Sequence, residues 1–237
     1  MAALNATLRP LAASDSLEAL TALLHRAYAW LGEMGLNFTA VDQSVETTKR
    51  RVESGQCFVA EIGQQLAGTV TVCDAYDPNT EPWARATPWF YRRDVAHLHQ
   101  LGVDPSARGQ GLGDQLVAAG EQWARDRGRG AIALDTAAPA AHLRQRYARL
   151  GYRDVDEVQW AGKTYRSVLM VAALADGRVH SVIEITQGGQ RFFANSIFFF
   201  VGGMIARVEE YWATVETAPA WRTAAAIGAY QRTEASA

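Results

Sequence analysis

The segment from Val103 to Gly113, VDPSARGQGLG, constrains the fold of this chain more than any other stretch. Residues 95–103 before it are rich in apolar side chains and are predicted to form a strand. Residues 112–127 after it carry apolar side chains at helical spacing. A strand that passes through a glycine-rich turn into an amphipathic helix is typical of sites that bind phosphate groups.

The glycines of this turn give the physical reason. Gly109, Gly111 and Gly113 have no Cβ, so the backbone can approach a ligand closely. The first amides of a helix have no partner within the helix, and the helix dipole adds about half a positive charge there. Arg108 supplies a forked cation that suits the oxygens of a pyrophosphate. The turn therefore predicts an anion site, although three glycines alone also fit a merely tight connection.

Two other phosphate-binding patterns fit this turn less well. A dinucleotide site of the Rossmann type is the nearest alternative, because Asp135 follows a predicted strand roughly 20 residues further on. However, the glycines run G-x-G-x-G, and residues 104–108 separate the strand from the first of them. A Walker loop needs a Lys-Ser/Thr pair, which is absent here.

Two motifs resemble those of the GNAT N-acetyltransferases. Arg108–Gly113 matches the R/Q-x-x-G-x-G/A signature of that family, and Arg146–Tyr152, RYARLGY, is similar to its LYxxxGF/GY element. The resemblance covers about residues 5–173. It implies an α/β (α+β) fold, with a mixed, mostly antiparallel central sheet flanked by helices. The elements expected are helices at 14–31, 112–127 and 139–149 and strands at 57–62, 66–74, 95–103, 131–135, 152–160 and 165–172.

The resemblance also implies acetyl-CoA as cofactor and a set of residues that hold it. The backbone of Leu101, Gly102 and Val103 would pair with the pantetheine arm. The amides of the turn would hold the pyrophosphate, and these belong to Gly109, Gln110, Gly111, Leu112 and Gly113. Many relatives carry Asn about seven residues before the motif tyrosine, where this chain has Ala140. His142 or Arg144 could take over that contact near the phosphates.

Acetyl transfer to an amine requires that the amine lose a proton, because an alkyl ammonium titrates near about 10. His97 and His99 alternate with their neighbours, so both side chains are expected on one face of the 95–103 strand. An imidazole can accept a proton at neutral pH, directly or through water. The run AHLHQLGV resembles the strand of the arylalkylamine N-acetyltransferases that carries such a His pair. Both could instead be hydrogen-bonded core groups.

Tyr147 is the expected acid. In the family, the tyrosine at this position of the motif faces the sulfur of CoA and protonates the departing thiolate. The alternative is that Tyr147 is simply a core aromatic of the 139–149 helix. Glu61 and Asp135 end predicted strands and could line the acceptor cleft, although a solvated position is the more common one.

The stretch from Tyr76 to Arg93 contains three prolines and several aromatic residues and is expected to form a long ordered loop. Together with Trp30, Met34 and Phe38, its aromatics could shape an apolar acceptor pocket or could only cover the sheet.

Composition limits the partners of this chain. With a net charge of -2 over 237 residues, nothing favours binding to nucleic acid or to a membrane surface. Cys57 and Cys73 match no metal or redox spacing, so no metal is expected. Residues 192–201 are too few to cross a bilayer, and the N-terminus does not resemble a signal peptide. A cytoplasmic location is the expectation.

The chain is expected to have a GNAT domain at 1–174 and a C-terminal module at 175–237. Glycine pairs punctuate that module and predict a three-stranded antiparallel meander at 178–187, 191–201 and 204–212. A helix is expected at 218–237. The end of the meander resembles the sheet half of a SnoaL-like, ketosteroid-isomerase-like domain. Its many Phe side chains need burial, and a homodimer is the expected way to provide it.

Two function classes remain open on this evidence. The first is an acetyl-CoA-dependent N-acetyltransferase that modifies a primary amine, expected to belong to a small molecule, with a protein N-terminus or lysine as the alternative acceptor. The second is a non-catalytic protein that binds or senses an acyl-CoA or a small ligand.

Overall fold

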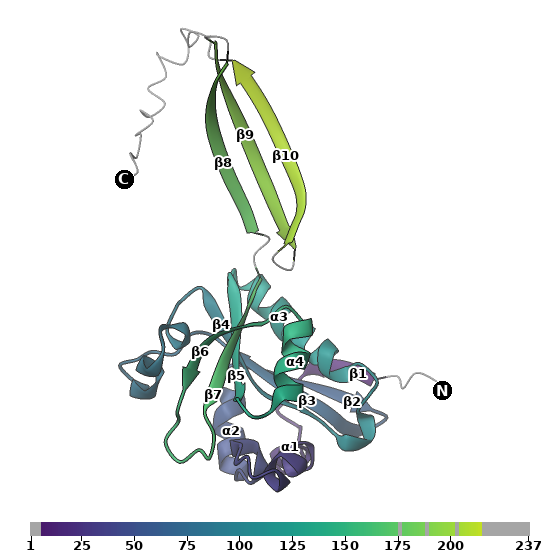
Figure 1. The fold of residues 1–237 in the computed structure, drawn as a ribbon. Helices are drawn as coiled ribbons and strands as arrows, with labels where there is room; N and C mark the ends of the chain where they lie inside the picture. Colours follow the sequence, from purple (N-terminus) through teal and green to yellow (C-terminus); the bar gives the residue numbers. More distant parts are fainter. Residues whose placement is uncertain (1–5, 175–176, 188–189, 202–203, 215–237) are drawn as a thin grey trace. The chain divides into compact units, whose positions relative to one another are not determined.

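The structure is a computed structural model that describes residues 6–174, 177–187, 190–201 and 204–214 (Figure 1). The chain divides into two compact units, residues 1–175 and 176–237. The helix expected at 218–237 and the glycine pairs 188–189 and 202–203 lie outside the described residues. Among the described residues, none of the helices has the length and apolar character needed to cross a membrane.

The first unit contains a seven-stranded sheet in the order β1-β2-β3-β4-β5-β7-β6 (Figure 1). Neighbouring strands are antiparallel except β4 and β5, which are parallel. This confirms the predicted mostly antiparallel α/β fold. The strands are Ala6–Pro10 (β1), Gln56–Ile62 (β2), Gln65–Cys73 (β3), Val95–Val103 (β4), Ala131–Ala137 (β5), Arg153–Val158 (β6) and Ser167–Ala173 (β7).

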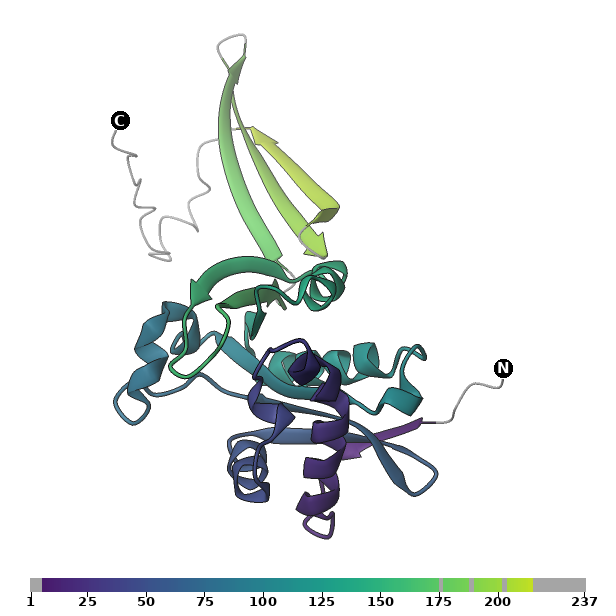
Figure 2. The ribbon, with the colours of Figure 1, turned by 60° about the horizontal axis from the view of Figure 1, so that its bottom comes forward.

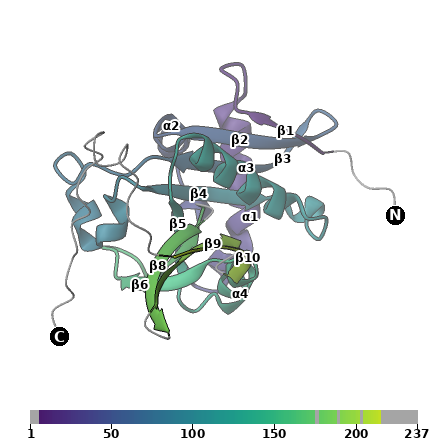
Figure 3. The same ribbon diagram turned by 90° about the horizontal axis from the view of Figure 1, so that it is seen from above.

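The parallel pair of β4 and β5 is joined by helix α3 (Leu112–Asp126), because parallel neighbours need a crossover connection. α3 packs on β2, β3 and β4, as the view from above shows (Figure 3). Its buried side chains follow the predicted helical spacing and include Leu112, Leu116, Val117 and Ala124. Burying each large aliphatic side chain of this kind stabilises the fold by about 2 kcal/mol.

Helix α1 (Leu17–Glu33) lies on the opposite face of the sheet from α3 (Figure 2). Two glycines show how closely both helices approach. A Cβ on Gly102 of β4 would lie 3.3 Å from the Cβ of Ala27 in α1, and a Cβ on Gly68 of β3 would lie 2.8 Å from Leu116 in α3. Both helices therefore rest almost directly on the backbone of the central strands.

The ends of the first helix differ slightly from the predicted 14–31. Ser16 is the N-cap and accepts a hydrogen bond of 3.1 Å from the amide of Ala19, so α1 begins at Leu17. The helix continues to Glu33. The predicted helix at 139–149 is α4, Ala141–Arg149, whose N-cap position is Ala140 without a side-chain cap.

Helix α2 (Val45–Glu53) and strand β1 were not predicted. α2 is mostly polar, and its single buried residue is Thr48, so its apolar periodicity is weak. The available signal was Ser44, which caps α2 by accepting from the amide of Thr47 at 3.1 Å. The predicted long loop at 76–93 is ordered by two short 3₁₀ helices, Pro82–Ala86 and Pro88–Phe90.

The second unit contains a three-stranded antiparallel sheet in the order β10-β9-β8, which confirms the predicted meander. Its strands are Gly177–Gln187 (β8), Gln190–Val201 (β9) and Met204–Thr214 (β10). Val182 and Ile183 are successive residues of β8 and are both exposed. Since successive side chains of a strand point to opposite faces, both faces of this sheet expose apolar side chains.

Candidate functional site

The candidate site begins where β4 and β5 separate. Their pairing ends at His97 and Ala133, although β4 continues to pair with β3 as far as Val103 and Gly68. An irregularity in β4 accompanies the separation, because Gln100 has a positive φ of 53° and the β3–β4 register shifts beside it. The last residues of β4, Leu101–Val103, therefore have a sheet edge that β5 does not cover.

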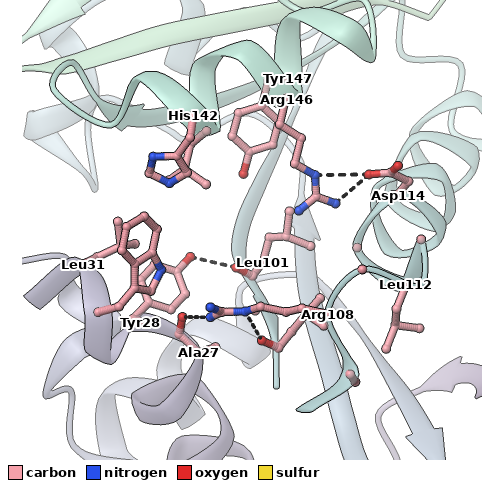
Figure 4. Close-up of a pocket in the computed structure, with 18 of the residues that line it drawn as sticks. Ala27, Tyr28, Leu31, Leu101, Arg108, Leu112, Asp114, His142, Arg146 and Tyr147 are labelled. Carbon is pink, nitrogen blue, oxygen red and sulfur yellow. Dashed lines mark hydrogen bonds and ion pairs between the residues drawn. The ribbon is translucent and has the colours of Figure 1, made fainter. Parts of the chain in front are cut away.

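A cavity of about 530 Å³ lies beside this edge (Figure 4). It is bordered by the end of α1, the end of β4, the glycine turn and one side of α4. The predicted cofactor residues that line it are Leu101, Gly102, Val103, Arg108, Gly109, Gly111, Leu112, Gly113 and His142. Gln110 and Arg144 are not among its lining residues.

The glycine turn presents free amides to this cavity. Within the described part of the chain, the amides of residues 109–113 donate no hydrogen bond to another protein group. Gly109 and Gly111 have φ of 78° and 75°, a conformation that costs other residues about 1 kcal/mol or more. Gly111 is also the N-cap of α3, so the free amides stand at the positive end of the helix dipole. These features fit the pyrophosphate of a coenzyme A molecule.

Two arginines border this cavity in different ways. Arg108 donates hydrogen bonds to the carbonyl oxygens of Ala27 at 2.6 Å and Val103 at 3.4 Å, so its guanidinium joins α1 to the turn (Figure 4). Arg146 of α4 pairs with Asp114 at 2.7 Å and lies beside Gly113 (Figure 4). A Cβ on Gly113 would come within 2.2 Å of the Arg146 guanidinium.

The expected substitutes for the missing Asn lie in different places. His142 lines the cavity, and its ring centroid lies 4.6 Å from that of Trp30. Burial lowers the pKa of His142, so this imidazole is neutral at pH 7. Arg144 instead forms an ion pair with Asp154 on β6. Its guanidinium is directed to the sheet edge, and Arg146 is the cation of α4 beside the glycine turn.

A second cavity, of about 540 Å³, lies next to the first. Tyr28, Leu101, Leu143 and Tyr147 line both cavities. Much of its remaining wall is aromatic, with Phe38, Tyr76, Trp83, Phe90, Trp160 and Tyr165. The predicted aromatic loop and Phe38 thus contribute to this second cavity. Trp30 lines the first cavity, and Met34 lines neither.

Tyr147 stands between the two cavities. Its side chain is buried, with an exposed fraction of 8%, and its hydroxyl points toward Leu101 (Figure 4). This hydroxyl makes no hydrogen bond within the described residues. Burial raises the pKa of Tyr147 to about 12, so the phenol is fully protonated at neutral pH. Tyr147 can therefore donate a proton to a group placed where the cavities meet.

His97 and His99 lie on one face of β4, opposite Cys73 and Thr71 of β3, but only His99 lines the second cavity. His97 packs against the rings of Phe90 and Tyr76, with centroids 5.2 and 5.0 Å away. Burial lowers the pKa of His97 to about 4. The pKa of His99 is lowered to about 3 by burial and, less strongly, by the charges of Arg51 and His97. Both imidazoles are neutral at pH 7 and are weak bases.

The two carboxylates singled out from the sequence have different surroundings. Glu61 pairs with Arg9 across β1 and β2 and does not line either cavity. Asp135 lines the second cavity and accepts a hydrogen bond of 3.2 Å from the indole of Trp160. Cys57 and Cys73 are buried and unpaired. Among the described residues, no group of three His, Cys, Asp or Glu side chains could hold a metal ion.

Sequence reasoning missed Tyr28, Leu143 and Arg146. Arg146 was within reach, because it directly precedes Tyr147 in the RYARLGY motif. Tyr28 follows the buried Ala27 on α1, and nothing in its spacing shows that its hydroxyl bonds to the Leu101 carbonyl. Leu143 lies four residues before Tyr147 on α4, at a spacing that places both on one helix face.

Comparison with known proteins gives a consistent result. The family described as "Acetyltransferase (GNAT) family" matches residues 18–152. The human N-acetyltransferase 8B is 33% identical over 113 residues, which are 47% of this chain and 45% of that protein. This chain thus spans less than half of the length of that relative.

Two solved structures share the fold. The ribosomal-protein-S18-alanine N-acetyltransferase of Escherichia coli has a TM-score of 0.54 at 19% identity, over 73% of this chain and 96% of that one. A GNAT family acetyltransferase of Elizabethkingia anophelis with acetyl-CoA bound has a TM-score of 0.50 at 16% identity, over 71% of this chain and 98% of that one. At these identities the likeness concerns the fold.

Proposed function

The chain belongs to the acetyltransferase (GNAT) family, and we propose that it transfers an acetyl group from acetyl-CoA to a primary amine of a small molecule. The transfer occurs by direct attack in a ternary complex. One observation carries this proposal: Tyr147, a protonated phenol, lies on the wall shared by a glycine-lined cavity and an aromatic-lined cavity. A donor in the first cavity and an acceptor in the second would meet at this residue.

The first cavity would hold the cofactor. The amides of Gly109, Gly111 and Gly113 and their neighbours would donate to the pyrophosphate oxygens, and Arg146 would add a positive charge beside them. The uncovered edge of β4 at Leu101–Val103 would supply backbone hydrogen bonds to the pantetheine arm. When bound, acetyl-CoA supplies the thioester carbonyl that the amine attacks.

In the reaction, the amine nitrogen forms a bond to the carbonyl carbon and the bond from that carbon to sulfur breaks. Tyr147 donates its proton to the departing sulfur and recovers one from solvent. The acceptor ammonium loses one proton to solvent before it attacks, and the nitrogen loses a second one through water as the new bond forms. His99 is the neutral hydrogen-bond acceptor that orients this water. His97 packs against Phe90 and does not touch the acceptor. Its role is to hold β4 in position.

An assay of free-thiol release from acetyl-CoA tests this proposal. The panel contains arylalkylamines, polyamines, amino acids and a peptide with a free N-terminus, so that small-molecule and protein acceptors are compared. We expect thiol release with at least one small amine. Binding of CoA without release with any acceptor would favour the alternative function, a protein that senses acyl-CoA. The aromatic wall of the second cavity and the likeness of β4 to the arylalkylamine strand both favour an apolar acceptor.

We also propose that residues 1–174 are the catalytic domain and that residues 175–237, which resemble part of a SnoaL-like domain, form a homodimerisation module. The exposed Val182, Ile183, Val208 and Tyr211 of the second sheet support this, because solvent-exposed apolar faces favour association. Light scattering of the full chain tests it, and a monomer would contradict it. The free thiols of Cys57 and Cys73 are consistent with a cytoplasmic location.

A further inference from the structure

The second cavity contains a cation whose role the acetyl transfer does not explain. Arg51 lies in the last turn of α2, is partly buried and lines this cavity. Within the described residues, its guanidinium takes part in no ion pair, hydrogen bond or ring contact. A guanidinium has a fixed fork of donors that matches a carboxylate. An unpaired one in a ligand cavity indicates that the ligand carries an anionic group.

The position of Arg51 is close to the proposed chemistry. Three residues later, the hydroxyl of Ser54 lies 3.3 Å from Nε2 of His99 and joins the end of α2 to β4. After desolvation, the charge of Arg51 is the next largest influence that lowers the pKa of both His99 and Lys163, two residues of the cavity wall. The charge of the Arg51 guanidinium therefore reaches the part of the second cavity that the acceptor amine must enter.

Two buried polar groups point to the same kind of ligand. Gln100 and Thr136 have exposed fractions of 5% and 3% and line the second cavity. Nε2 of Gln100 and Oγ1 of Thr136 have no hydrogen-bond partner in the described structure. Oε1 of Gln100 already accepts from Thr71, so the unused group is a donor. Buried donors without partners are costly, and a bound carboxylate would satisfy them.

The irregularity in β4 explains why Gln100 is available. In a regular strand, Gln100 and His99 would point to opposite faces of the sheet. Thr71 faces His99 across the β3–β4 pair and donates to Gln100 at 3.4 Å, so Gln100 has turned to the face of His99. This turn requires the positive φ of 53°, which is strained for a residue with a side chain.

The rest of the cavity suits an apolar body with an ammonium group. Trp83 lies against Tyr76, Phe90 and Trp160, with centroids 4.6, 5.4 and 5.9 Å away. Glu81 lines the same cavity, and its carboxylate has no ion pair or side-chain hydrogen bond among the described residues. A cavity with aromatic walls and unpaired charges of both signs matches a zwitterion with an apolar side chain.

We propose that the acceptor is an α-amino acid with an aromatic side chain, and that Arg51 and Gln100 bind its carboxylate. This inference rests on the proposed acetyl transfer and names its substrate class. An aromatic amino acid and an arylalkylamine share an aromatic group and a primary amine, but the arylalkylamine lacks the carboxylate. The proposal therefore predicts that the protein prefers the amino acid.

The test compares L-phenylalanine with phenethylamine, and L-tryptophan with tryptamine, in the thiol-release assay on the full chain. For the wild type we expect kcat/KM to be at least about tenfold higher for each amino acid than for its amine. Arg51→Gln should bring the ratio of the two kcat/KM values close to one, chiefly through a higher KM for the amino acid. Arg51→Lys should retain part of the preference. Lys49→Gln, on the same helix but outside the cavity lining, is the matched control and should leave the preference intact.

Calorimetric titration of each compound into the protein with CoA provides a readout independent of turnover. Equal binding and equal rates for amino acid and amine, in a protein that acetylates amines, would overturn the inference and leave the proposed function standing. An absence of acetylation and of CoA binding would instead contradict the proposed function. If Arg51 serves only the end of α2, Arg51→Gln would lower the unfolding midpoint with no change in selectivity, which would also overturn the inference.

Discussion

The hydroxyl of Tyr28 donates a hydrogen bond of 2.8 Å to the carbonyl oxygen of Leu101. The bond joins α1 to β4 just beyond the point where β4 and β5 separate, and both residues line both cavities. Burial raises the pKa of Tyr28 well above its ordinary value, so the phenol is protonated and can donate at neutral pH.

Tyr28→Phe should therefore lower the free energy of unfolding by about 1 kcal/mol, because the Leu101 carbonyl loses a buried partner. Urea unfolding at pH 7 measures this loss. The control is Tyr91→Phe, since Tyr91 is exposed and its hydroxyl has no hydrogen bond among the described residues. That control should stay within about 0.5 kcal/mol of the wild type. An unchanged stability of Tyr28→Phe would show that the bond contributes nothing.

Tyr147→Phe removes the proposed acid with little change in shape. We expect kcat to fall by about 10²-fold because the departing sulfur is no longer protonated, with the Kd for CoA within about twofold of the wild type. Steady-state kinetics and calorimetry measure the two quantities. Tyr152→Phe is the control, since Tyr152 is buried, bonds to Glu121 at 3.2 Å and does not line either cavity. If both variants turn over at the wild-type rate, Tyr147 is not the acid.

The buried histidines predict an acid-sensitive stability. The pKa values of His97 and His99 are lowered to about 4 and about 3 by burial, and in the unfolded chain they return to about 6.5. The unfolded state therefore binds more protons below pH 6.5, and the folded state loses stability as the pH falls from about 6.5 toward 4. Each imidazole contributes a slope of up to about 1.4 kcal/mol per pH unit.

Urea unfolding of the wild type and of a His97→Asn, His99→Asn double variant between pH 7 and 4.5 checks this slope. The double variant should be less stable at pH 7 and should depend less on pH. The lowered pKa values also predict a pH–rate profile with no inflection near 6.5 from these two residues. Parallel stability curves for the two proteins would mean that both imidazoles titrate alike in the folded and unfolded states, which would contradict the lowered pKa values.

The two neighbouring arginines of α4 give a paired test of the cofactor cavity. Arg146 lies beside Gly113 at the opening of α3, whereas Arg144 pairs with Asp154 outside the cavity. Arg146→Gln should raise the Kd for CoA by about tenfold, because a cation near the pyrophosphate is lost. Arg144→Gln should leave the Kd unchanged. Calorimetric titration with CoA measures both, and equal effects would show that the α4 cation does not contact the cofactor.

The sequence predicted the elements whose signals are local. The glycine turn and the apolar stripe of α3 could be located because chain geometry and apolar spacing determine them directly, whereas the motif around Tyr147 was identified from its resemblance to the GNAT element. Helix α2 was not predicted because its contacts are polar. The position of its Arg51 in the wall of the second cavity depends on how the helix packs in three dimensions. Likewise, the separation of β4 from β5 was not predicted, because a backbone angle at Gln100 is not encoded in residue spacing.

The roles within the site were harder to predict than its location. His97 and His99 were indistinguishable by alternation. His97 packs against Phe90 and Tyr76, and His99 is the one of the two that lines the second cavity. Arg144 and Arg146 both follow Ala140 within a short helix, and the helical rotation between them decides which one faces the glycine turn. Such distinctions arise from side-chain direction in three dimensions.

The central claim is that the glycine turn at the start of α3 binds the pyrophosphate of coenzyme A, and calorimetric titration of the wild-type chain tests it most directly. CoA and pantetheine share the thiol arm, but pantetheine lacks the pyrophosphate and the nucleotide attached to it. We expect CoA to bind at least about 100-fold more tightly, which corresponds to two or more hydrogen bonds from free amides to a charged group. Failure of CoA to bind, or equal affinities for CoA and pantetheine, would contradict the claim.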